Sequence, residues 1–400
     1  MKQSLLRYCC RVTAWLSVSL LTSVCSPQHK DQLATLDIEK GIQNGSSPLL
    51  SDYCSSLEYI PLQTDSSALL SDFIRQLTCL GENYFFFIEH NSRQGKLFNK
   101  EGKFLTNIGA HGNAKGEYRN PMGVFLDETK GEIIINDINK LISYDLTGKM
   151  IKEITLDSLN KEGQFLYSIN SLGERAYTVS RSSFENEPSV AFINDKGEIL
   201  HLYEEFRPVS GMSPAPETDV KIVEPMHTYM YDGKLHLVTS TNDTVFCFNA
   251  AFEKQPSYIK KFGRYKLLPN ESNRERSVTI LGSVIQETAG ALFFQLMING
   301  NKFSYSRPNS QFLEAIYDKK TGIVSGIAYD PEFKSVGLKN DIDGGAPFWP
   351  SQVSGTKMYQ MINAFKFIEM SKAGKSAKMK EIAANLTEDS NPVLVVADLK

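Results

Sequence analysis

Histidine, arginine, carboxylate and aromatic side chains recur in the segments that join the predicted β-strands. These segments open each repeating β-unit or join its second strand to its third, and such loops emerge on one face of a closed ring of sheets. Because binding residues concentrate on loops held by a rigid scaffold, the candidate ligand-binding residues are His90, Arg93, His111, Tyr118, Arg119, Asp137, Asp343, Phe348 and Trp349. An aromatic ring beside carboxylate and guanidinium groups suits a sugar ring or a peptide.

A structural role is the alternative for each candidate residue. Phe348 and Trp349 begin a predicted inner strand and could only fill space between sheets, while Glu117 to Arg119 could only tie a loop to its neighbour. Both readings remain open at the level of sequence.

No motif of a known reaction accompanies these residues. The chain lacks a Gly-Xaa-Ser-Xaa-Gly nucleophile turn, a His-Glu-Xaa-Xaa-His pair and a phosphate loop. Asn340 to Gly344 places oxygen ligands at alternate positions as a calcium loop does, but Pro350 stands where the EF-hand glutamate belongs. We therefore assign no catalytic residue, no metal ligand and no cofactor, and expect a turn held by aspartate side chains.

The first 24 residues differ in composition from the rest of the chain. Lys2, Arg7 and Arg11 precede an apolar stretch from Val12 to Leu21, which is too short to span a bilayer and is typical of a secretory signal. Removing residues 1 to 24 lowers the formal net charge from -3 to -6, because those three basic residues leave with the signal. We expect an exported, mildly acidic protein.

Cys25 resembles the lipid-accepting cysteine of bacterial lipoproteins, which follows a leucine and two small residues. In this sequence Leu21 stands four residues before Cys25 and Val24 takes the last small position. The resemblance implies a lipid anchor at Cys25, with residues 25 to 52 as anchor and tether, and an outer-membrane lipoprotein of the cell envelope. Cleavage near Cys25 without lipidation, which would leave the protein in the periplasm, is the alternative.

Three other cysteines remain in the exported chain, namely Cys54, Cys79 and Cys247. Their odd number and wide spacing fit neither a disulfide framework nor a zinc pattern. Cys79 and Cys247 lie in strand-like runs, which predicts buried, unreactive thiols.

The overall composition is that of a folded globular protein. Lys and Arg number 43 against 46 Asp and Glu, with 41% hydrophobic residues. The interspersed charges give no basic patch, so we expect no nucleic-acid partner.

Residues 53 to 400 consist of repeated β-rich units. Each unit has short alternating β-runs and a turn with glycine, and Gly102, Gly148 and Gly197 recur at spacings of 46 and 49 residues. A four-stranded unit of about 40 to 50 residues is the period of a β-propeller blade. The sequence predicts an all-β propeller.

The junction from Ile108 to Asp127 resembles the NHL-type propeller repeat, with its glycines, an aromatic residue, then Pro121, Gly123 and Val124. Together with Asp341 to Pro350 and Asn391 to Val393, it makes the chain similar to the six-bladed NHL-like or TolB-like propeller lipoproteins of Gram-negative bacteria. That resemblance implies export and a binding role and carries over no catalytic residue.

The two ends of the chain indicate how the ring closes. Leu57 to Leu62 and Asn391 to Asp398 are isolated strands, which could complete one blade together and remove an exposed edge. We place the six blades near 72–108, 121–154, 164–203, 220–262, 276–327 and 346–400 plus the N-terminal strand, with a helical insert at about 361–388 in the last blade. Seven blades remain an alternative because the units are long.

The function expected from these features is noncatalytic recognition or scaffolding of a glycan, a peptide or an envelope protein, with the membrane reached only through the lipid anchor. The alternative is a metal-dependent propeller lyase or hydrolase, with histidines converging on the central channel.

Overall fold

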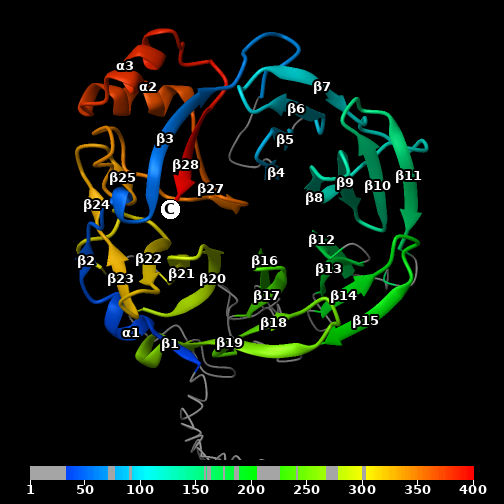
Figure 1. Cartoon of the computed structure of the whole chain (residues 1–400), viewed down its shortest axis with the longest axis horizontal. Coiled ribbons are helices and arrows are strands. Elements are labelled where there is room, and N and C mark those ends of the chain that lie inside the picture. The colour runs from blue at the N-terminus through cyan, green and yellow to red at the C-terminus, as the bar shows by residue number, and fades with distance from the viewer. Residues whose placement is uncertain are drawn as a thin grey trace, which may run out of the picture. The chain divides into compact units, whose positions relative to one another are not determined.

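The computed structural model describes residues 33–70, 77–89, 92–156, 159, 164–173, 176–183, 189–204, 226–239, 242–266, 278–299 and 303–400. Six sheets follow one another around a central channel (Figure 1). Each has four antiparallel strands from the innermost to the outermost, so the predicted six-bladed β-propeller is confirmed.

The blades agree closely with the predicted ranges. They comprise β4 (Leu77–Leu80), β5 (Tyr84–Ile88), β6 (Gly95–Asn99) and β7 (Phe104–Ile108) in blade 1; β8 (Pro121–Asp127), β9 (Glu132–Asp137), β10 (Lys140–Asp145) and β11 (Met150–Thr155) in blade 2; β12 (Gln164–Leu172), β13 (Ala176–Ser183), β14 (Ser189–Ile193) and β15 (Ile199–Glu204) in blade 3; β16 (Met226–Tyr231), β17 (Lys234–Thr239), β18 (Thr244–Phe248) and β19 (Lys254–Lys261) in blade 4; β20 (Ile280–Glu287), β21 (Ala291–Ile298), β22 (Phe312–Asp318) and β23 (Ile323–Ile327) in blade 5; and β26 (Gln352–Ser354), β27 (Lys357–Ile362), β28 (Val393–Leu399) and β3 (Cys54–Pro61) in blade 6.

The second strand of several blades carries a continuous run of apolar residues. Phe85 to Phe87 in β5 and Ile133 to Ile135 in β9 are all buried. Both faces of these sheets pack against neighbouring blades, so the usual alternation of polar and apolar residues is lost. Blade 2 packs on blade 3 in this way through Ile134 and Ala191.

Strands from the two ends of the chain close the ring, as predicted. β3 pairs antiparallel with β28, with Tyr59 opposite Val395 and Pro61 opposite Val393. β3, which precedes blade 1 in the sequence, is thus the outermost strand of blade 6, and this blade combines strands from both sides of the other five blades in the sequence.

The segment that we expected to be a tether is folded from residue 33 onward. β1 (Ala34–Asp37) pairs in parallel with β19, α1 (Ile38–Gly41) follows, and β2 (Gly45–Ser46) pairs in parallel with β23. Leu36, Ile38 and Ile42 are fully buried. These few apolar residues in a polar stretch anchor a strap along the outer edges of blades 4 and 5, so the predicted tether of residues 25 to 52 is wrong from residue 33 onward.

The turn between the third and fourth strands shows why glycine recurs there. In blade 2 the Asp145 carboxylate accepts hydrogen bonds from Thr147 N (2.9 Å) and Lys149 N (3.0 Å), and Gly148 adopts a φ of +87°. A Cβ on Gly148 would lie 2.5 Å from the carbonyl oxygen of Asn107, in the outer strand of blade 1. Glycine is therefore needed both for the turn and for the contact between blades.

Blade 4 departs from this pattern. Its turn begins with Asn249, whose side chain accepts from Ala251 N and Glu253 N, but Phe252 occupies the glycine position with a φ of +64°. The Phe252 ring packs on Phe192 and stacks on His201 of blade 3.

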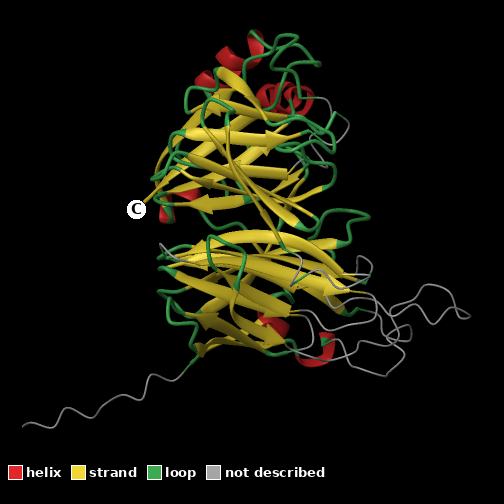
Figure 2. Ribbon diagram, turned by 90° about the vertical axis from the view of Figure 1, so that its right-hand side faces the viewer, coloured by secondary structure: helices red, strands yellow, loops and turns green. Residues whose placement is uncertain are grey.

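The predicted helical insert is present between β27 and β28, where α2 (Ala364–Ala373) and α3 (Ala377–Ala384) pack on blade 6 (Figure 2). Phe367, Met370 and Met379 are buried in its core. Met361, which the helical spacing placed in the insert, belongs to β27 instead, because its backbone pairs with Leu394. Among the described residues no helix has both the length and the apolar character needed to cross a membrane. The remaining short elements are η1 (Leu50–Asp52), η2 (Gly263–Tyr265), β24 (Tyr329–Asp330) and β25 (Ser335–Val336).

Candidate functional site

A cavity of about 1100 Å³ occupies the central channel. Residues of all six innermost strands line it, together with the turns that lead from the first strand of a blade to the second, including Gly81, Gly173 and Gly355. The cavity therefore opens on the face opposite to the loops that the sequence had singled out.

The channel wall is made of neutral hydrogen-bonding and apolar side chains. Five strands each supply a hydroxyl or an amide group, namely those of Thr78, Asn170, Thr228, Gln286 and Gln352. The charged side chains that line the cavity lie at its rim, namely Glu82, Asp127, Glu128 and Lys130. A wall of this kind matches uncharged polar ligands, because it offers donors and acceptors without a charge to be neutralised.

Several wall side chains also join neighbouring blades. The Gln352 amide donates to Leu80 O (2.9 Å) and accepts from Leu80 N (3.1 Å), so it continues the backbone ladder from blade 6 to blade 1. Gln286 accepts from Val353 N at 3.2 Å. The positions of these amides are thus held by the scaffold.

At the rim, Glu128 holds the turn of the neighbouring blade. Its carboxylate accepts hydrogen bonds from the backbone N–H groups of Glu82 (3.2 Å), Asn83 (2.8 Å) and Tyr84 (2.9 Å). Glu82 in turn accepts from Thr356 N at 3.2 Å. The rim carboxylates therefore fix the turns around the mouth of the cavity.

Away from the charged rim, the titratable groups that line the cavity are His227, Cys79 and Tyr229, and the Tyr229 hydroxyl is bonded to Glu287. The His227 Nε2 lies 3.1 Å from Ile285 O, and burial lowers the pKa of the imidazole, so the ring is neutral. Burial raises the pKa of the Cys79 thiol to about 11, which leaves it protonated. Neither His227 nor Cys79 has the environment of an activated nucleophile. No three His, Cys, Asp or Glu side chains of the described chain are grouped so that they could hold a metal ion.

The structure brings four predicted site residues together on the opposite face, where they build the loop itself. The Asp137 carboxylate accepts from Arg119 N (3.0 Å) and Asn120 N (2.6 Å). Arg93 Nη1 donates to Asn120 Oδ1 (2.6 Å) and to Arg119 O. Tyr118 is fully buried, and its hydroxyl accepts from Gly95 N and donates to Ile108 O.

Two of the predicted binding residues on this face have exposed side chains. His111 and Arg119 are exposed on this face, and within the described residues their side chains make no hydrogen bond or ion pair. Ligand contact through them stays a prediction, whereas the burial of Tyr118 assigns it to packing. His90 and the predicted lipidation site Cys25 lie outside the described residues.

The predicted residues of blade 6 also have structural roles. Asp343 accepts from Asn340 Nδ2 (2.7 Å), Tyr59 OH (3.2 Å) and Ser376 Oγ (2.6 Å), so it links β3, its own turn and the start of α3. This confirms a turn held by aspartate. Phe348 is buried in the core, and the half-buried Trp349 packs edge-on against Phe293 with ring centroids 5.5 Å apart.

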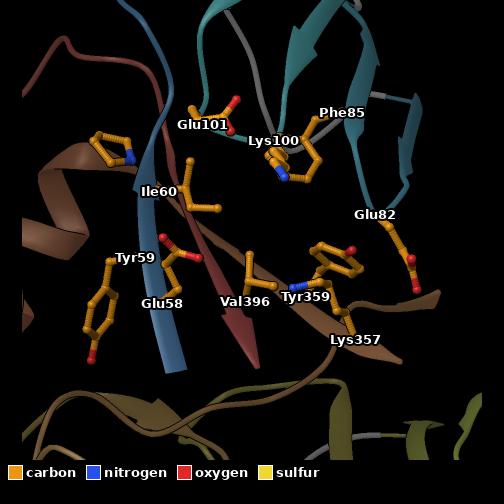
Figure 3. A pocket seen from close by; sticks show the side chains of 11 residues that line it. Glu58, Tyr59, Ile60, Glu82, Phe85, Lys100, Glu101, Lys357, Tyr359 and Val396 are labelled. Carbon is orange, nitrogen blue, oxygen red and sulfur yellow. The ribbon is translucent and has the colours of Figure 1, made fainter. Parts of the chain in front are cut away.

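Two smaller cavities lie near the channel face. One of about 350 Å³ between blades 6 and 1 is lined by Glu58, Glu82, Glu101, Lys100 and Lys357 (Figure 3). Its charges are mixed and mostly exposed, and Lys357 pairs with Asp398 at 2.8 Å. The other, of about 530 Å³, lies beside the channel over blade 5 and shares Met230, Val353 and Gly355 with it.

None of the residues that line the channel is among the binding residues predicted from the sequence. A signal was present, because polar residues such as Thr78, Asn170 and Gln352 interrupt strands whose neighbours in the same blade are apolar. Which of these strands is innermost, however, depends on the ring and not on local sequence.

A closed ring of six antiparallel four-stranded sheets around a channel defines a six-bladed β-propeller with a channel-mouth cavity. Within this class, the chain belongs to the family described as domain of unknown function DUF4934, whose sequence profile matches residues 33–398. No curated protein matches the sequence.

Solved structures share the architecture. A candidate exported protein of Bacteroides fragilis superposes with a TM-score of 0.64 at 16% identity, covering 90% of this chain and 99% of that one. A DUF4221-family protein from Bacteroides vulgatus has a TM-score of 0.49 at 11% identity, covering 87% and 97%. A catalytically inactive virginiamycin B lyase from Staphylococcus aureus has 0.40 at 12%, covering 91% and 98%. The first establishes the fold, and the lower-scoring two carry no argument about activity.

Proposed function

We propose that this protein is an exported, noncatalytic recognition module that binds an uncharged polar segment of a glycan or a peptide in its central channel. The observation that carries the proposal is the cavity of about 1100 Å³, with neutral hydroxyl and amide groups held around it by the blades. A rigid set of donors and acceptors favours binding, because little conformational entropy is lost when a ligand enters.

The compartment follows from the N-terminal segment. The basic and apolar pattern before Cys25 supports export, and the B. fragilis protein with the same fold is likewise described as a candidate exported protein. We propose a lipid anchor at Cys25 and a place in the outer membrane among the NHL-like or TolB-like propeller lipoproteins, with at most seven residues between the anchor and residue 33 of the folded strap.

The channel environment favours binding over the alternative lyase or hydrolase. His227 is the histidine among the residues that line the cavity, and its Nε2 already contacts Ile285 O. The wall thiol of Cys79 is protonated. The groups that catalysis would need in a reactive state are thus engaged or neutral.

The test is a thermal-unfolding screen with neutral oligosaccharides and peptides, because a ligand that binds the folded state raises the midpoint by mass action. The variant Thr78→Trp places a large ring in the channel, whereas Thr106→Trp places the same ring on β7, the outer strand of the same blade. We expect the shift to survive in Thr106→Trp and to be lost in Thr78→Trp. A shift that both variants retain would place the ligand elsewhere, and the absence of any shift with either ligand class would refute the proposed ligand.

A further inference from the structure

The cavity of about 530 Å³ beside the channel, which we call the lateral cavity, is lined by segments that lie far apart in the sequence. η1 supplies Asp52 and Tyr53, and the end of β16 with the turn after it supplies Tyr231 and Asp232. Ala289 lies in the first turn of blade 5. Because the lateral cavity shares three lining residues with the channel cavity, one extended ligand can occupy both.

The local structure holds the aspartates and tyrosines of the lateral cavity in place. Asp232 and Gly233 form a two-residue hairpin turn in which both have a positive φ, of +50° and +68°, as in a type I′ turn. The Tyr53 hydroxyl donates to Asp318 Oδ2 at 3.1 Å, and its ring packs edge-on against Phe293. These side chains are therefore positioned by the scaffold before a ligand enters.

The charges around the lateral cavity favour a neutral ligand. Asp52, Asp232 and Lys400 line it, and within the described part of the chain their side chains form no hydrogen bond or ion pair. The two carboxylates repel an anion. A cation is disfavoured because Lys319 Nζ already lies 4.2 Å from the centre of the Tyr231 ring.

Among neutral ligands, a sugar ring fits the lateral cavity better than a peptide segment. Each sugar hydroxyl both donates and accepts, so one ring can donate to Asp52 and Asp232 and accept from Lys400. A peptide backbone also carries carbonyl oxygens that only accept, and near these carboxylates such oxygens would lack a donor. The aromatic rings of Tyr53 and Tyr231 match the C–H faces of a sugar.

We propose that the ligand is a neutral oligosaccharide, which extends from the channel over blade 5 and places a sugar ring in the lateral cavity, where Asp52 and Asp232 accept from its hydroxyl groups. This inference rests on the proposed channel function, and it adds the choice of a glycan over a peptide and a second subsite. Since both cavities bind parts of one chain, affinity rises with oligosaccharide length until both are occupied.

The test is isothermal titration of the purified full-length protein with neutral oligosaccharides of increasing length and with uncharged peptides of serine, asparagine and glutamine. Ala289→Trp fills the lateral cavity at a residue that does not line the channel, and we expect it to weaken binding of the longest oligosaccharide by about tenfold or more. Ala251→Trp makes the same change in an exposed turn of blade 4 that lines none of the three cavities, and it should bind as the parent does.

A second pair of variants tests the carboxylates. Asp232→Asn keeps the turn, because asparagine also adopts a positive φ, but it loses the stronger hydrogen bonds of a charged acceptor. We expect it to weaken oligosaccharide binding by about tenfold. Asp389→Asn, at an exposed position outside the lateral cavity, is the matched control and should leave affinity unchanged. Thermal unfolding without ligand checks that each variant is folded.

The outcomes separate this inference from the proposed channel function. Oligosaccharide binding that is unchanged in Ala289→Trp and Asp232→Asn would overturn the lateral subsite, and binding of the peptides alone would overturn the choice of a glycan. In both cases, loss of that binding in Thr78→Trp would leave the channel function standing. Oligosaccharide binding that survives in Thr78→Trp would refute the channel function and a ligand that extends through both cavities, and the absence of binding by either ligand class would overturn both proposals.

Discussion

The Tyr229 hydroxyl of blade 4 donates a 2.7 Å hydrogen bond to Glu287 Oε2 of blade 5. Glu287 Oε1 accepts from Tyr258 OH at 2.5 Å and from Lys319 Nζ at 2.7 Å, and the Glu287 side chain is fully buried. Donors from β16, from β19 and from the turn after β22 thus converge on one carboxylate beside the channel. Breaking a buried charge network of this kind leaves the remaining partners unsatisfied.

We expect Glu287→Gln to lower the free energy of unfolding by about 2–4 kcal/mol, because the amide loses the charge that Lys319 neutralises and cannot accept from all three donors. Chemical denaturation measures the change. Glu388→Gln, at an exposed position, is the control and should alter stability by less than about 0.5 kcal/mol. Equal changes in the free energy of unfolding for the two substitutions would show that the Glu287 network does not stabilise the fold.

The glycine of the turn between the third and fourth strands should be required for contact between blades as well as for the turn. A Cβ at Gly148 would lie 2.5 Å from Asn107 O. Gly233, in the turn between β16 and β17, is the control, because it has a φ of +68° but no atom within 4 Å of the position of a Cβ. We expect Gly233→Ala to cost about 1 kcal/mol and Gly148→Ala at least about 2 kcal/mol. Similar losses of unfolding free energy in both variants would assign the whole effect to backbone strain.

Stability should fall on mild acidification. Burial lowers the pKa of His227 and of His236, so both rings are neutral in the folded protein, while the unfolded chain takes up protons near pH 6.5. A lowered pKa of a base means that the stabilisation is present above pH 6.5 and is lost as the pH falls below it. Glu287, 3.9 Å from His236 Nδ1, opposes this effect in part, and Lys234 and Lys319 support it.

The expected slope between pH 6.5 and 5 is up to about 1.4 kcal/mol per pH unit for each histidine. Urea denaturation at several pH values measures this slope. His227→Gln removes one titrating group, so we expect it to reduce the slope by up to about 1.4 kcal/mol per pH unit. A pH-independent free energy of unfolding over this range would contradict the lowered pKa values.

The lipid anchor predicts that Cys25→Ser moves the exported protein from the membrane fraction to the soluble fraction. Cys54→Ser is the matched control, because Cys54 is a buried free thiol within the folded propeller and should leave the distribution unchanged. Membrane association that persists in Cys25→Ser would exclude lipidation at this residue as the anchor.

Much of the architecture was predictable because it is encoded locally. The turns at Gly102, Gly148 and Gly197 and the apolar runs from Phe85 to Phe87 and from Ile133 to Ile135 identify the blades without any long-range information. The candidate site was less predictable. The residues of the opposite loops, such as Asp137 and Tyr118, have the types expected of a binding site, yet the folded chain uses them to bond its own backbone.

The sequence by itself determined the β-propeller class and the closure by strands from both ends, and it favoured six blades over seven, because periodicity and turn chemistry act over a few residues. Only the tertiary structure decided that residues 34–46 form a strap, that Thr78, Asn170 and Gln352 line a channel, and that Glu287 joins two blades. The physical reason is that each of these features depends on contacts between segments far apart in the chain, and local sequence does not specify which segments meet.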